Sequence, residues 1–107
     1  MKVLVLGGCG IQGRAALYDL SRNDSVDHVT CADIQPERVD SFAFIDKSKI
    51  QFERIDANDP NALASKMDEK FDVVLDFLPP QWVRTVAEAA IKSGVHLVNT
   101  NYAFDIL

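Results

Sequence analysis

The sequence lacks the features that mark membrane-spanning, secreted and nucleic-acid-binding chains. No apolar run approaches the roughly 20 residues that a bilayer-spanning helix needs, and the opening residues, MKVLVLG, have too short an apolar stretch for a secretory signal. Eleven basic against sixteen acidic residues give a formal charge of -5 without a Lys/Arg cluster, which argues against a nucleic-acid partner. The sequence therefore predicts a soluble protein with no membrane partner, for which the cytoplasm is the default compartment.

Cysteine is scarce, with two residues in a chain of 107. Cys9 and Cys31 do not form the CxxC or Cys/His spacing of a metal site, so the sequence predicts no bound metal. Two thiols in a cytoplasmic chain rarely form a structural disulfide. We therefore expect both cysteines to be reduced packing residues.

Histidine and tyrosine, two side chains often used for proton transfer, are also scarce, with two of each. Neither Tyr18 nor Tyr102 is followed four positions later by lysine, so the Tyr-x-x-x-Lys pair that short-chain dehydrogenases use for proton transfer is absent. His28 begins a predicted strand and His96 lies within one, where packing or edge roles are more common than base catalysis. The sequence therefore identifies no catalytic residue in this chain.

The sequence is rich instead in short runs of Val, Ile and Leu that alternate with segments of helical period. Five such runs occupy residues 2–6, 28–32, 50–55, 72–77 and 95–99. Strands separated by helices need crossover connections, and these produce a parallel sheet covered on both faces. Because crossovers are right-handed, the sequence predicts a single α/β domain over residues 1–107, a doubly wound parallel sheet of about five strands.

Four helices are expected between these strands. The first carries small and apolar residues at i, i+3, i+4 and i+7, namely Gly13, Ala16, Leu17 and Leu20. The second is expected to begin at Pro36, and the third at Pro60 with Asp59 as its capping residue. The fourth presents an apolar face formed by Val83, Val86, Ala87, Ala90 and Ile91. It is expected to end at Gly94, which suits a left-handed exit.

The first strand leads into a glycine-rich turn, GGCGIQGR over residues 7–14, with GxGxxG at positions 8, 10 and 13 and GxxGxxG at 7, 10 and 13. An apolar strand precedes the motif, a helix follows it, and an acidic residue lies twenty positions beyond Gly13 at the end of the second strand. Gly8 and Gly10 would let the backbone approach a pyrophosphate, while Gly13 would let helix and strand pack closely. The amides of Ile11 and Gln12 would point at that pyrophosphate, so the sequence predicts a dinucleotide site in a Rossmann fold.

The acidic residue is Asp33, and Ile34 follows it at the same strand end. The Asp33 carboxylate would accept hydrogen bonds from the adenosine ribose hydroxyls, and its negative charge would repel the additional phosphate of NADP. NAD is therefore the favoured cofactor, with Ile34 beside it. NADP stays open because Arg38, or Arg14 as a second candidate, could accommodate a 2′-phosphate.

Two further strand ends are expected at the same crevice, since ligands of open α/β sheets bind outside the carboxyl ends of the strands. Asp56 and Ala57 would lie beside the adenine, where a carboxylate can accept from the exocyclic amine. Asp56 could equally shape the loop before the next helix. Leu78 and Pro79 would flank the ribose and nicotinamide, although the following Pro80 also fits the start of a helix.

Four segments of the sequence together resemble one enzyme family. They read KVLVLGGCGIQGR, ADIQPERV, ERIDANDPNAL and DVVLDFLPPQWVRTVAEAAIKSGVHLVNTNY, and they cover nearly the whole chain. In this order they resemble the N-terminal domain of the saccharopine dehydrogenase group, which includes lysine 6-dehydrogenase and carboxynorspermidine dehydrogenase. The resemblance implies an NAD(P)-dependent oxidoreductase acting on the C–N bond of an amino acid or a polyamine-related amine. By position, it implies cofactor contacts at Gly8, Gly10, Ile11, Gln12, Asp33, Asp56, Ala57, Leu78 and Pro79.

A substrate-binding region has no counterpart in these 107 residues. We therefore expect a cofactor domain that lacks its C-terminal substrate domain and is inactive by itself. Exposed apolar side chains would mark where that domain docks or where two copies of the chain meet, and the candidates are Trp82, Tyr102, Phe104, Ile106 and Leu107. Trp82 could instead cover a ligand. A non-catalytic dinucleotide-sensing module of the atypical short-chain dehydrogenase type is the alternative interpretation.

Overall fold

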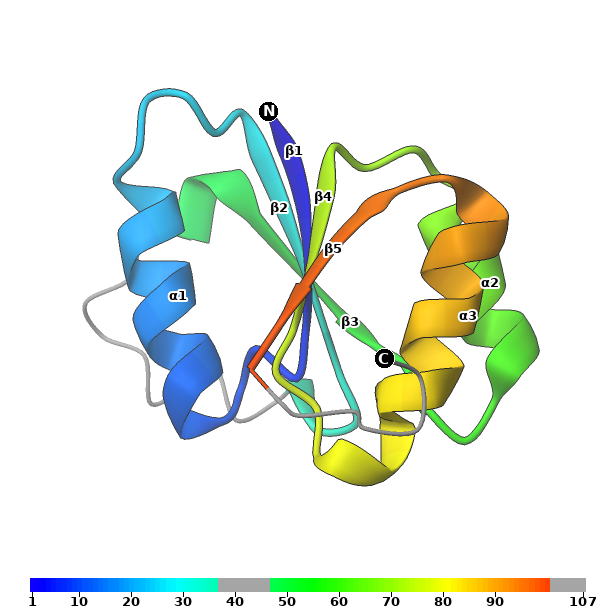
Figure 1. The fold of residues 1–107 in the computed structure, drawn as a ribbon. Coiled ribbons are helices and arrows are strands. Elements are labelled where there is room, and N and C mark those ends of the chain that lie inside the picture. Colours follow the sequence, from blue (N-terminus) through cyan, green and yellow to red (C-terminus); the bar gives the residue numbers. More distant parts are fainter. Residues whose placement is uncertain (37–46, 101–107) are drawn as a thin grey trace.

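The computed structural model describes residues 1–36 and 47–100. Five strands form one parallel sheet in the order β3-β2-β1-β4-β5 (Figure 1). They are β1 (Lys2–Leu6), β2 (His28–Asp33), β3 (Ile50–Arg54), β4 (Val73–Asp76) and β5 (His96–Asn99). Each strand agrees with its predicted range to within one residue at either end, so the doubly wound parallel sheet is confirmed. The helix expected from Pro36 falls on residues 37–46 and lies outside the described residues.

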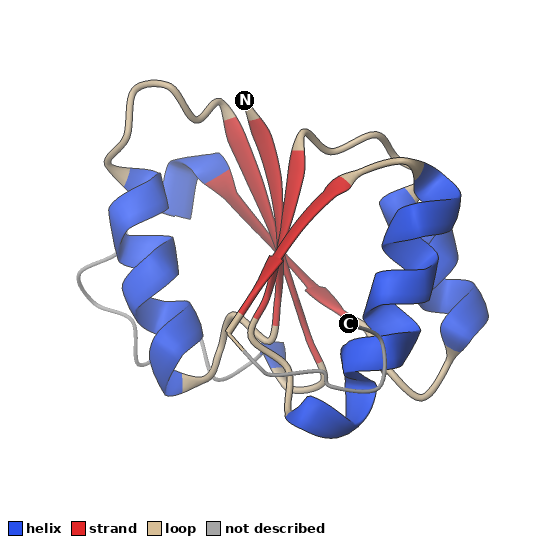
Figure 2. Cartoon of the chain, viewed as in Figure 1, coloured by secondary structure: helices blue, strands red, loops and turns tan. Residues whose placement is uncertain are grey.

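Helices cover both faces of the sheet, as Figures 1 and 2 show. On one face lies α1 (Ile11–Ser21), and on the other lie α2 (Pro60–Met67) and α3 (Val83–Ser93). The 3₁₀ turns η2 (Lys47–Lys49) and η3 (Pro80–Trp82) lead into β3 and α3. None of the helices in the described part of the chain is long and apolar enough to cross a membrane.

Local capping fixes two helix ends as predicted. Asp59 precedes α2, and Pro60 occupies the first helical position, where no amide is needed. The Asp59 Oδ1 accepts hydrogen bonds from the amides of Asn61 and Ala62, both at 3.1 Å. The second is the C-terminal end of α3, where Gly94 is the capping residue. Its φ of 69° lies in the left-handed region that glycine adopts readily.

The apolar face predicted for α3 is correct except at its last position. Val83, Val86 and Ala90 are buried, and Ala87 is half-buried. Ile91 is 79% exposed, so its assignment to the buried face was wrong. The buried residues of α3 also include Ala89, so the buried side is centred near Val86. At about 100° per residue, Ile91 lies far to one side of that centre, beyond the half-buried Ala87.

The sheet separates two apolar clusters. Val5 and Leu17 belong to the cluster between the sheet and α1, and each is 0% exposed. Leu4, Leu63 and Val86 belong to the cluster beneath α2 and α3, and are likewise 0% exposed. Successive strand residues point to opposite faces, so neighbours in β1 enter different clusters. Full burial of one such side chain contributes about 1.5–3 kcal/mol, and the helices are therefore held firmly against both faces.

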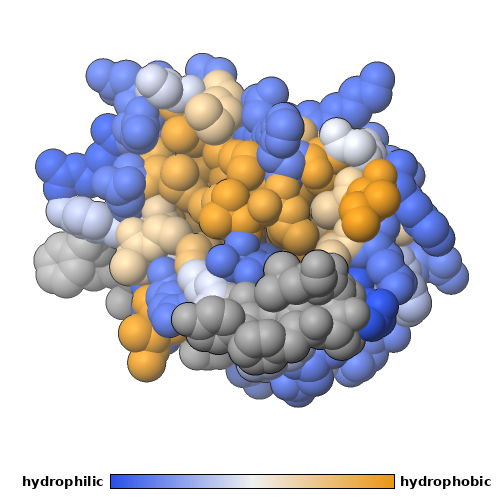
Figure 3. All heavy atoms as spheres, in the orientation of Figure 1, coloured by the Kyte–Doolittle hydropathy of each residue, from blue (hydrophilic) through white to orange (hydrophobic). Residues whose placement is uncertain are grey.

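β5 forms an edge of the sheet and is less covered than the central strands. Its His96 and Val98 are exposed, with Val98 at 56%. Val98 pairs in register with Leu75, and Val73, Leu75 and Phe77 are only partly buried on the α1 side. Figure 3 shows a broad apolar surface on the face where β5 lies. We call the four residues Val73, Leu75, Phe77 and Val98 the β4–β5 ledge.

Candidate functional site

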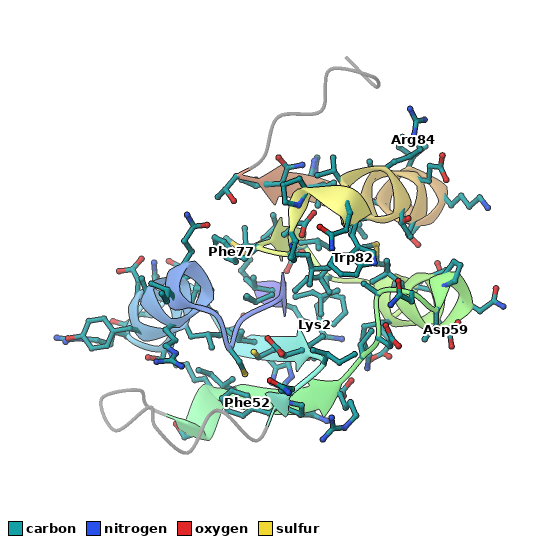
Figure 4. The ribbon with its side chains drawn as sticks, turned by 90° about the horizontal axis from the view of Figure 1, so that it is seen from below. Lys2, Phe52, Asp59, Phe77, Trp82 and Arg84 are labelled. Atoms are coloured by element: carbon teal, nitrogen blue, oxygen red, sulfur yellow. The ribbon has the colours of Figure 1, made fainter. Side chains whose placement is uncertain are left out.

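A cavity of about 380 Å³ opens at the carboxyl ends of the strands. This is the place at which open α/β sheets bind ligands. The walls come from the ends of four strands and the segments that follow them: Gly7, Gly10, Asp33, Ile34, Ile55, Asp56, Ala57, Asn58, Phe77, Leu78, Pro79 and Trp82. Figure 4 views the molecule from this end, with Phe77 on the α1 side and Trp82 on the α2 side.

The cavity brings together seven of the eleven residues that the sequence predicted as cofactor-binding. They are Gly10, Asp33, Ile34, Asp56, Ala57, Leu78 and Pro79. The other four, Gly8, Ile11, Gln12 and Gly13, lie in the glycine-rich turn and the first turn of α1, next to the lining residue Gly10. Sequence reasoning missed Ile55, Asn58 and Phe77. The only signal was their position, since Ile55 and Phe77 end apolar runs and Asn58 lies three residues beyond one.

The glycines of the turn have different structural roles. Gly7 adopts φ +74°, which side chains disfavour. A Cβ on Gly13 would approach the Gly8 Cα to 2.5 Å, and a Cβ on Gly8 would approach the Cys31 Sγ to 2.3 Å, so both positions need glycine for packing. A Cβ on Gly10 would meet nothing nearer than the Gly7 oxygen at 3.5 Å. The space beside Gly10 is therefore open, and it belongs to the cavity.

The start of α1 faces this opening with the positive end of the helix. Gly10 is the capping residue and supplies no side chain to the first amides, and the first turn has no acidic residue. Ile11 has an 86% exposed side chain, so its backbone is the part suited to an anion. Arg14, on the same turn of helix, donates from Nε to the Cys9 carbonyl at 3.4 Å.

Asp33 is the last residue of β2 and is only 5% exposed. Its Oδ2 accepts a hydrogen bond from the Cys9 amide at 3.0 Å, and its Oδ1 accepts one from the Gln35 amide at 2.8 Å. The carboxylate therefore ties the glycine-rich turn to the end of β2. Each carboxylate oxygen has a second lone pair, so Asp33 can accept from ligand hydroxyls while keeping both bonds.

Arg54 is a basic residue at the site that sequence reasoning missed. It ends β3 in register with Asp33, and its Nη1 donates to the carbonyl of Ile34. A guanidinium thus lies beside the acidic strand end. The available signal was a basic residue at the end of the third apolar run. Of the arginines that the sequence suggested, Arg38 lies outside the described residues and Arg14 is bonded to the glycine-rich turn.

The loop between β3 and α2 forms the wall nearest α2. Asp56 Oδ1 accepts from the Asn58 amide at 2.9 Å, which is the loop-shaping role that the sequence left open. Asn58 Oδ1 in turn accepts from the indole Nε1 of Trp82 at 3.1 Å. Trp82 is half-buried and packs against the cluster beneath α2 and α3, so it is not the exposed aromatic that the sequence allowed.

The end of β4 carries a buried carboxylate that sequence reasoning passed over. Asp76 is 1% exposed, its Oδ1 accepts from the Leu78 amide at 2.9 Å, and its buried Oδ2 has no hydrogen-bond partner in the described part of the chain. Burial raises the pKa of Asp76 from 3.8 to about 6. Beyond Leu78 and Pro79, Pro80 does open a helical segment, the 3₁₀ turn η3, with α3 following.

The cysteines and histidines have no part in the cavity wall. Cys9 and Cys31 are buried thiols outside any disulfide, which confirms the expectation of packing residues. Burial raises the pKa of the Cys31 thiol, and the neighbouring Cys9 raises it further. His28 and His96 begin their strands, at the end of the sheet opposite the cavity. Among residues 1–36 and 47–100, no three His, Cys, Asp or Glu side chains gather into a possible metal site.

Comparison with solved structures finds the same architecture in dehydrogenases and reductases. Saccharopine dehydrogenase (L-Glu forming) from Saccharomyces cerevisiae superposes with a TM-score of 0.80 at 25% identity, over 95% of this chain and 22% of that one. Triphenylmethane reductase from Citrobacter sp. gives a TM-score of 0.75 at 20% identity, over 97% of this chain and 38% of the reductase. A short-chain dehydrogenase/reductase from Veillonella parvula gives 0.73 at 14% identity, over 95% and 47%. The last two likenesses show the fold alone.

The chain spans less than half the length of each of these solved proteins. Its sequence nevertheless matches one family along almost its entire length. Residues 3–105 match the family described as the saccharopine dehydrogenase NADP binding domain, which contains the glycine-rich turn and all five strand ends. The resemblance inferred from the four sequence segments is thereby confirmed, and the chain belongs to the saccharopine dehydrogenase NADP binding domain family.

Proposed function

We propose that this chain binds a nicotinamide dinucleotide with the pyrophosphate at the start of α1 and the adenosine in the cavity. The observation that carries the proposal is the open space beside Gly10, which is both the cap of α1 and a residue of the cavity wall. A phosphate must approach backbone amides closely, and a side chain at this position would block that approach. Membership of the family over residues 3–105 supports the same class of ligand.

The residues around the opening suit a dinucleotide. The amides of Ile11 and Gln12, at the positive end of α1, would donate to the pyrophosphate oxygens. Asp33 would accept from the ribose hydroxyls through its second lone pairs. When bound, the dinucleotide would supply a hydride acceptor or donor. This chain's part would be to bind and orient it.

The remaining cavity residues divide between the two halves of the ligand. Ile34, Asp56 and Ala57 follow β2 and β3 and would surround the adenine half. Leu78 and Pro79 follow β4, which lies on the other side of β1, and would flank the ribose on the nicotinamide side. This division follows from the strand order, in which β2 and β3 lie on one side of β1 and β4 and β5 lie on the other. The crevice for a ligand lies between β1 and β4, where the two halves of the sheet meet.

We propose NAD as the favoured form of the cofactor. The negative charge of Asp33 at the ribose would repel a 2′-phosphate. The description of the family names NADP, and the Arg54 guanidinium at the neighbouring strand end could attract that phosphate. Titration calorimetry with both dinucleotides distinguishes the alternatives. Tighter binding of NAD supports the proposal, and tighter binding of NADP contradicts it.

Gly10→Val tests the phosphate site. The variant should stay folded, because the space beside Gly10 is open, yet lose measurable NAD binding. Circular dichroism checks the fold and titration calorimetry checks binding. Ala15→Val, an exposed substitution on α1, is the matched control and should bind NAD like the unaltered chain. A folded Gly10→Val chain that binds NAD normally would overturn the proposal.

The substrate is proposed from the family. We infer oxidation or reduction at the C–N bond of an amino acid or a polyamine-related amine, with the substrate held by a part of the protein outside these 107 residues. The 22% coverage of the yeast enzyme supports such a part, and the apolar β4–β5 ledge offers it a surface. Full-length protein should turn over lysine, saccharopine or carboxynorspermidine with the dinucleotide. Tight binding without any turnover would favour a dinucleotide-sensing module instead.

A further inference from the structure

A second hollow lies beside the cavity and shares part of its wall. The hollow measures about 410 Å³ and is lined by Ala57, Asn58, Pro60, Gln81, Trp82 and Thr85. Ala57, Asn58 and Trp82 line the cavity as well. Asn58 and Trp82 therefore form a partition that faces the cavity on one side and the hollow on the other.

The partition is fixed by hydrogen bonds at both ends. The indole Nε1 of Trp82 donates to Asn58 Oδ1 at 3.1 Å, across 24 positions of the sequence. The Asn58 amide donates to Asp56 Oδ1 at 2.9 Å, and the Trp82 amide donates to the Pro79 carbonyl at 3.1 Å. The ring also packs against the apolar cluster beneath α2 and α3. Its orientation is therefore set before any ligand arrives, which lowers the entropy cost of binding.

The two ends of the cavity differ in chemistry. The end at Gly7 and Gly10 adjoins the positive start of α1. The end at Trp82 combines the apolar side chains of Ile55 and Ala57 with the polar side chains of Asp56 and Asn58, and it holds no basic residue of the cavity wall. An indole whose single donor is already satisfied offers a base its ring surface without requiring a polar partner. A planar base fits this end better than a phosphate does.

We propose that the Asn58–Trp82 partition is the adenine-recognition wall of the domain, with the indole ring packed against the purine. The inference rests on the proposed function, because it takes the pyrophosphate to lie at α1. It adds that affinity comes mainly from the adenosine half. Adenosine diphosphate ribose should therefore bind nearly as tightly as NAD, while nicotinamide mononucleotide should bind far more weakly.

Fluorescence can test this directly because Trp82 is the one tryptophan in the sequence. Excitation selective for tryptophan reports on the partition alone. NAD and adenosine diphosphate ribose should change the intensity or wavelength of emission, and nicotinamide mononucleotide at equal concentration should not. Asn58→Ala, which removes the acceptor for the indole, should shift the emission of the ligand-free chain and weaken the response to NAD.

Substitutions measure the contribution of the wall. Trp82→Ala should weaken binding of NAD and of adenosine diphosphate ribose by the same factor, about tenfold or more. Trp82→Phe should recover part of that loss. Gln81→Ala is the matched control, since Gln81 lines the hollow but not the cavity, and should bind normally. Circular dichroism checks the fold of each variant. If Trp82→Ala does not fold, the emission titration of the unaltered chain still tests whether the ligand contacts Trp82.

The outcomes separate this inference from the proposed function. If calorimetry finds no dinucleotide binding to the unaltered chain, the proposed function fails and this inference fails with it. If NAD binds but leaves Trp82 emission unchanged, or binds a folded Trp82→Ala chain equally well, the adenine wall is overturned while the dinucleotide site stands.

Discussion

Replacing Asp76 with asparagine should stabilise the folded domain at neutral pH. Asp76 is 1% exposed, and only one of its carboxylate oxygens has a hydrogen-bond partner, the Leu78 amide. Ionisation therefore leaves a negative charge in an apolar setting with the described chain offering Oδ2 no donor. Asparagine keeps an oxygen for the Leu78 amide and removes the charge.

The magnitude follows from the pKa of Asp76, which burial raises from 3.8 to about 6. The folded state binds the proton more tightly than the unfolded chain does. The contribution of Asp76 to the free energy of unfolding therefore falls as pH rises through the window between those two values, and it is flat above that window. Compared with its value in strong acid, the free energy of unfolding is lowered by the ionisation of Asp76. The linkage between proton binding and folding gives a decrease of about 1.5 kcal/mol at pH 5 and about 3 kcal/mol at pH 8.

The protonated carboxyl group and the carboxamide are both neutral, and each would place one donor-bearing atom where Oδ2 lies. Their costs in acid should therefore be similar, so the stability gained by Asp76→Asn should track the loss caused by ionisation. We expect a gain of about 3 kcal/mol at pH 8 that shrinks to about 1.5 kcal/mol at pH 5. For a domain with a total stability of about 5–15 kcal/mol, this difference is large.

Urea unfolding followed by circular dichroism at several values between pH 5 and pH 8 measures the gain. Asp19→Asn, on the exposed side of α1, is the matched control and should stay within about 0.5 kcal/mol at each pH. The reasoning is refuted if Asp76→Asn is no more stable than the unaltered chain at pH 8. A gain of the same size at every pH would also refute it, because the charge would then not be the cause.

Two further predictions concern the cofactor. Asp33→Ala should weaken NAD binding by about 1.5–3 kcal/mol, because it removes the acceptors for the ribose hydroxyls, and should affect NADP less; unchanged NAD affinity in calorimetry would contradict the role of Asp33. The 107-residue chain should bind NAD yet form no NADH from lysine, saccharopine or carboxynorspermidine, since hydride transfer needs a substrate held within about 3.5 Å of the nicotinamide. Absorbance at the NADH band checks this, and any turnover would place a catalytic group inside this domain.

Features that depend on neighbouring residues were predictable from the sequence. The strand bounds, the cap at Asp59 and the left-handed end at Gly94 all agree with the structure. Apolar period, capping and turn chemistry act over a few residues, so each leaves a local pattern. The glycine-rich turn followed by Asp33 belongs to the same class, because its spacing is set within a single strand–helix–strand unit.

Several residues predicted to bind the cofactor line one cavity, because the carboxyl ends of parallel strands meet at one edge of the sheet. Seven predicted residues line the cavity for this reason. The sequence left open whether Asp56 shapes its own loop, and it gave no sign of the backbone amides that Asp33 binds. Asp33 bonds to the amides of Cys9 and Gln35, and Asp56 bonds to the next turn of its own loop. Each carboxylate therefore shapes the site as well as lining it.

The sequence by itself determined the strands, most of the helices, their order and the edge of the sheet at which the cavity opens. Only the tertiary structure decided that Asp76 is buried, that Trp82 meets Asn58, and that Arg54 reaches the end of β2. These features join positions that are distant in the chain, and they depend on strand order and register. A shift of one residue in register would turn every side chain of a strand to the opposite face of the sheet. Local sequence patterns do not specify which residues, distant in the sequence, each of those side chains contacts.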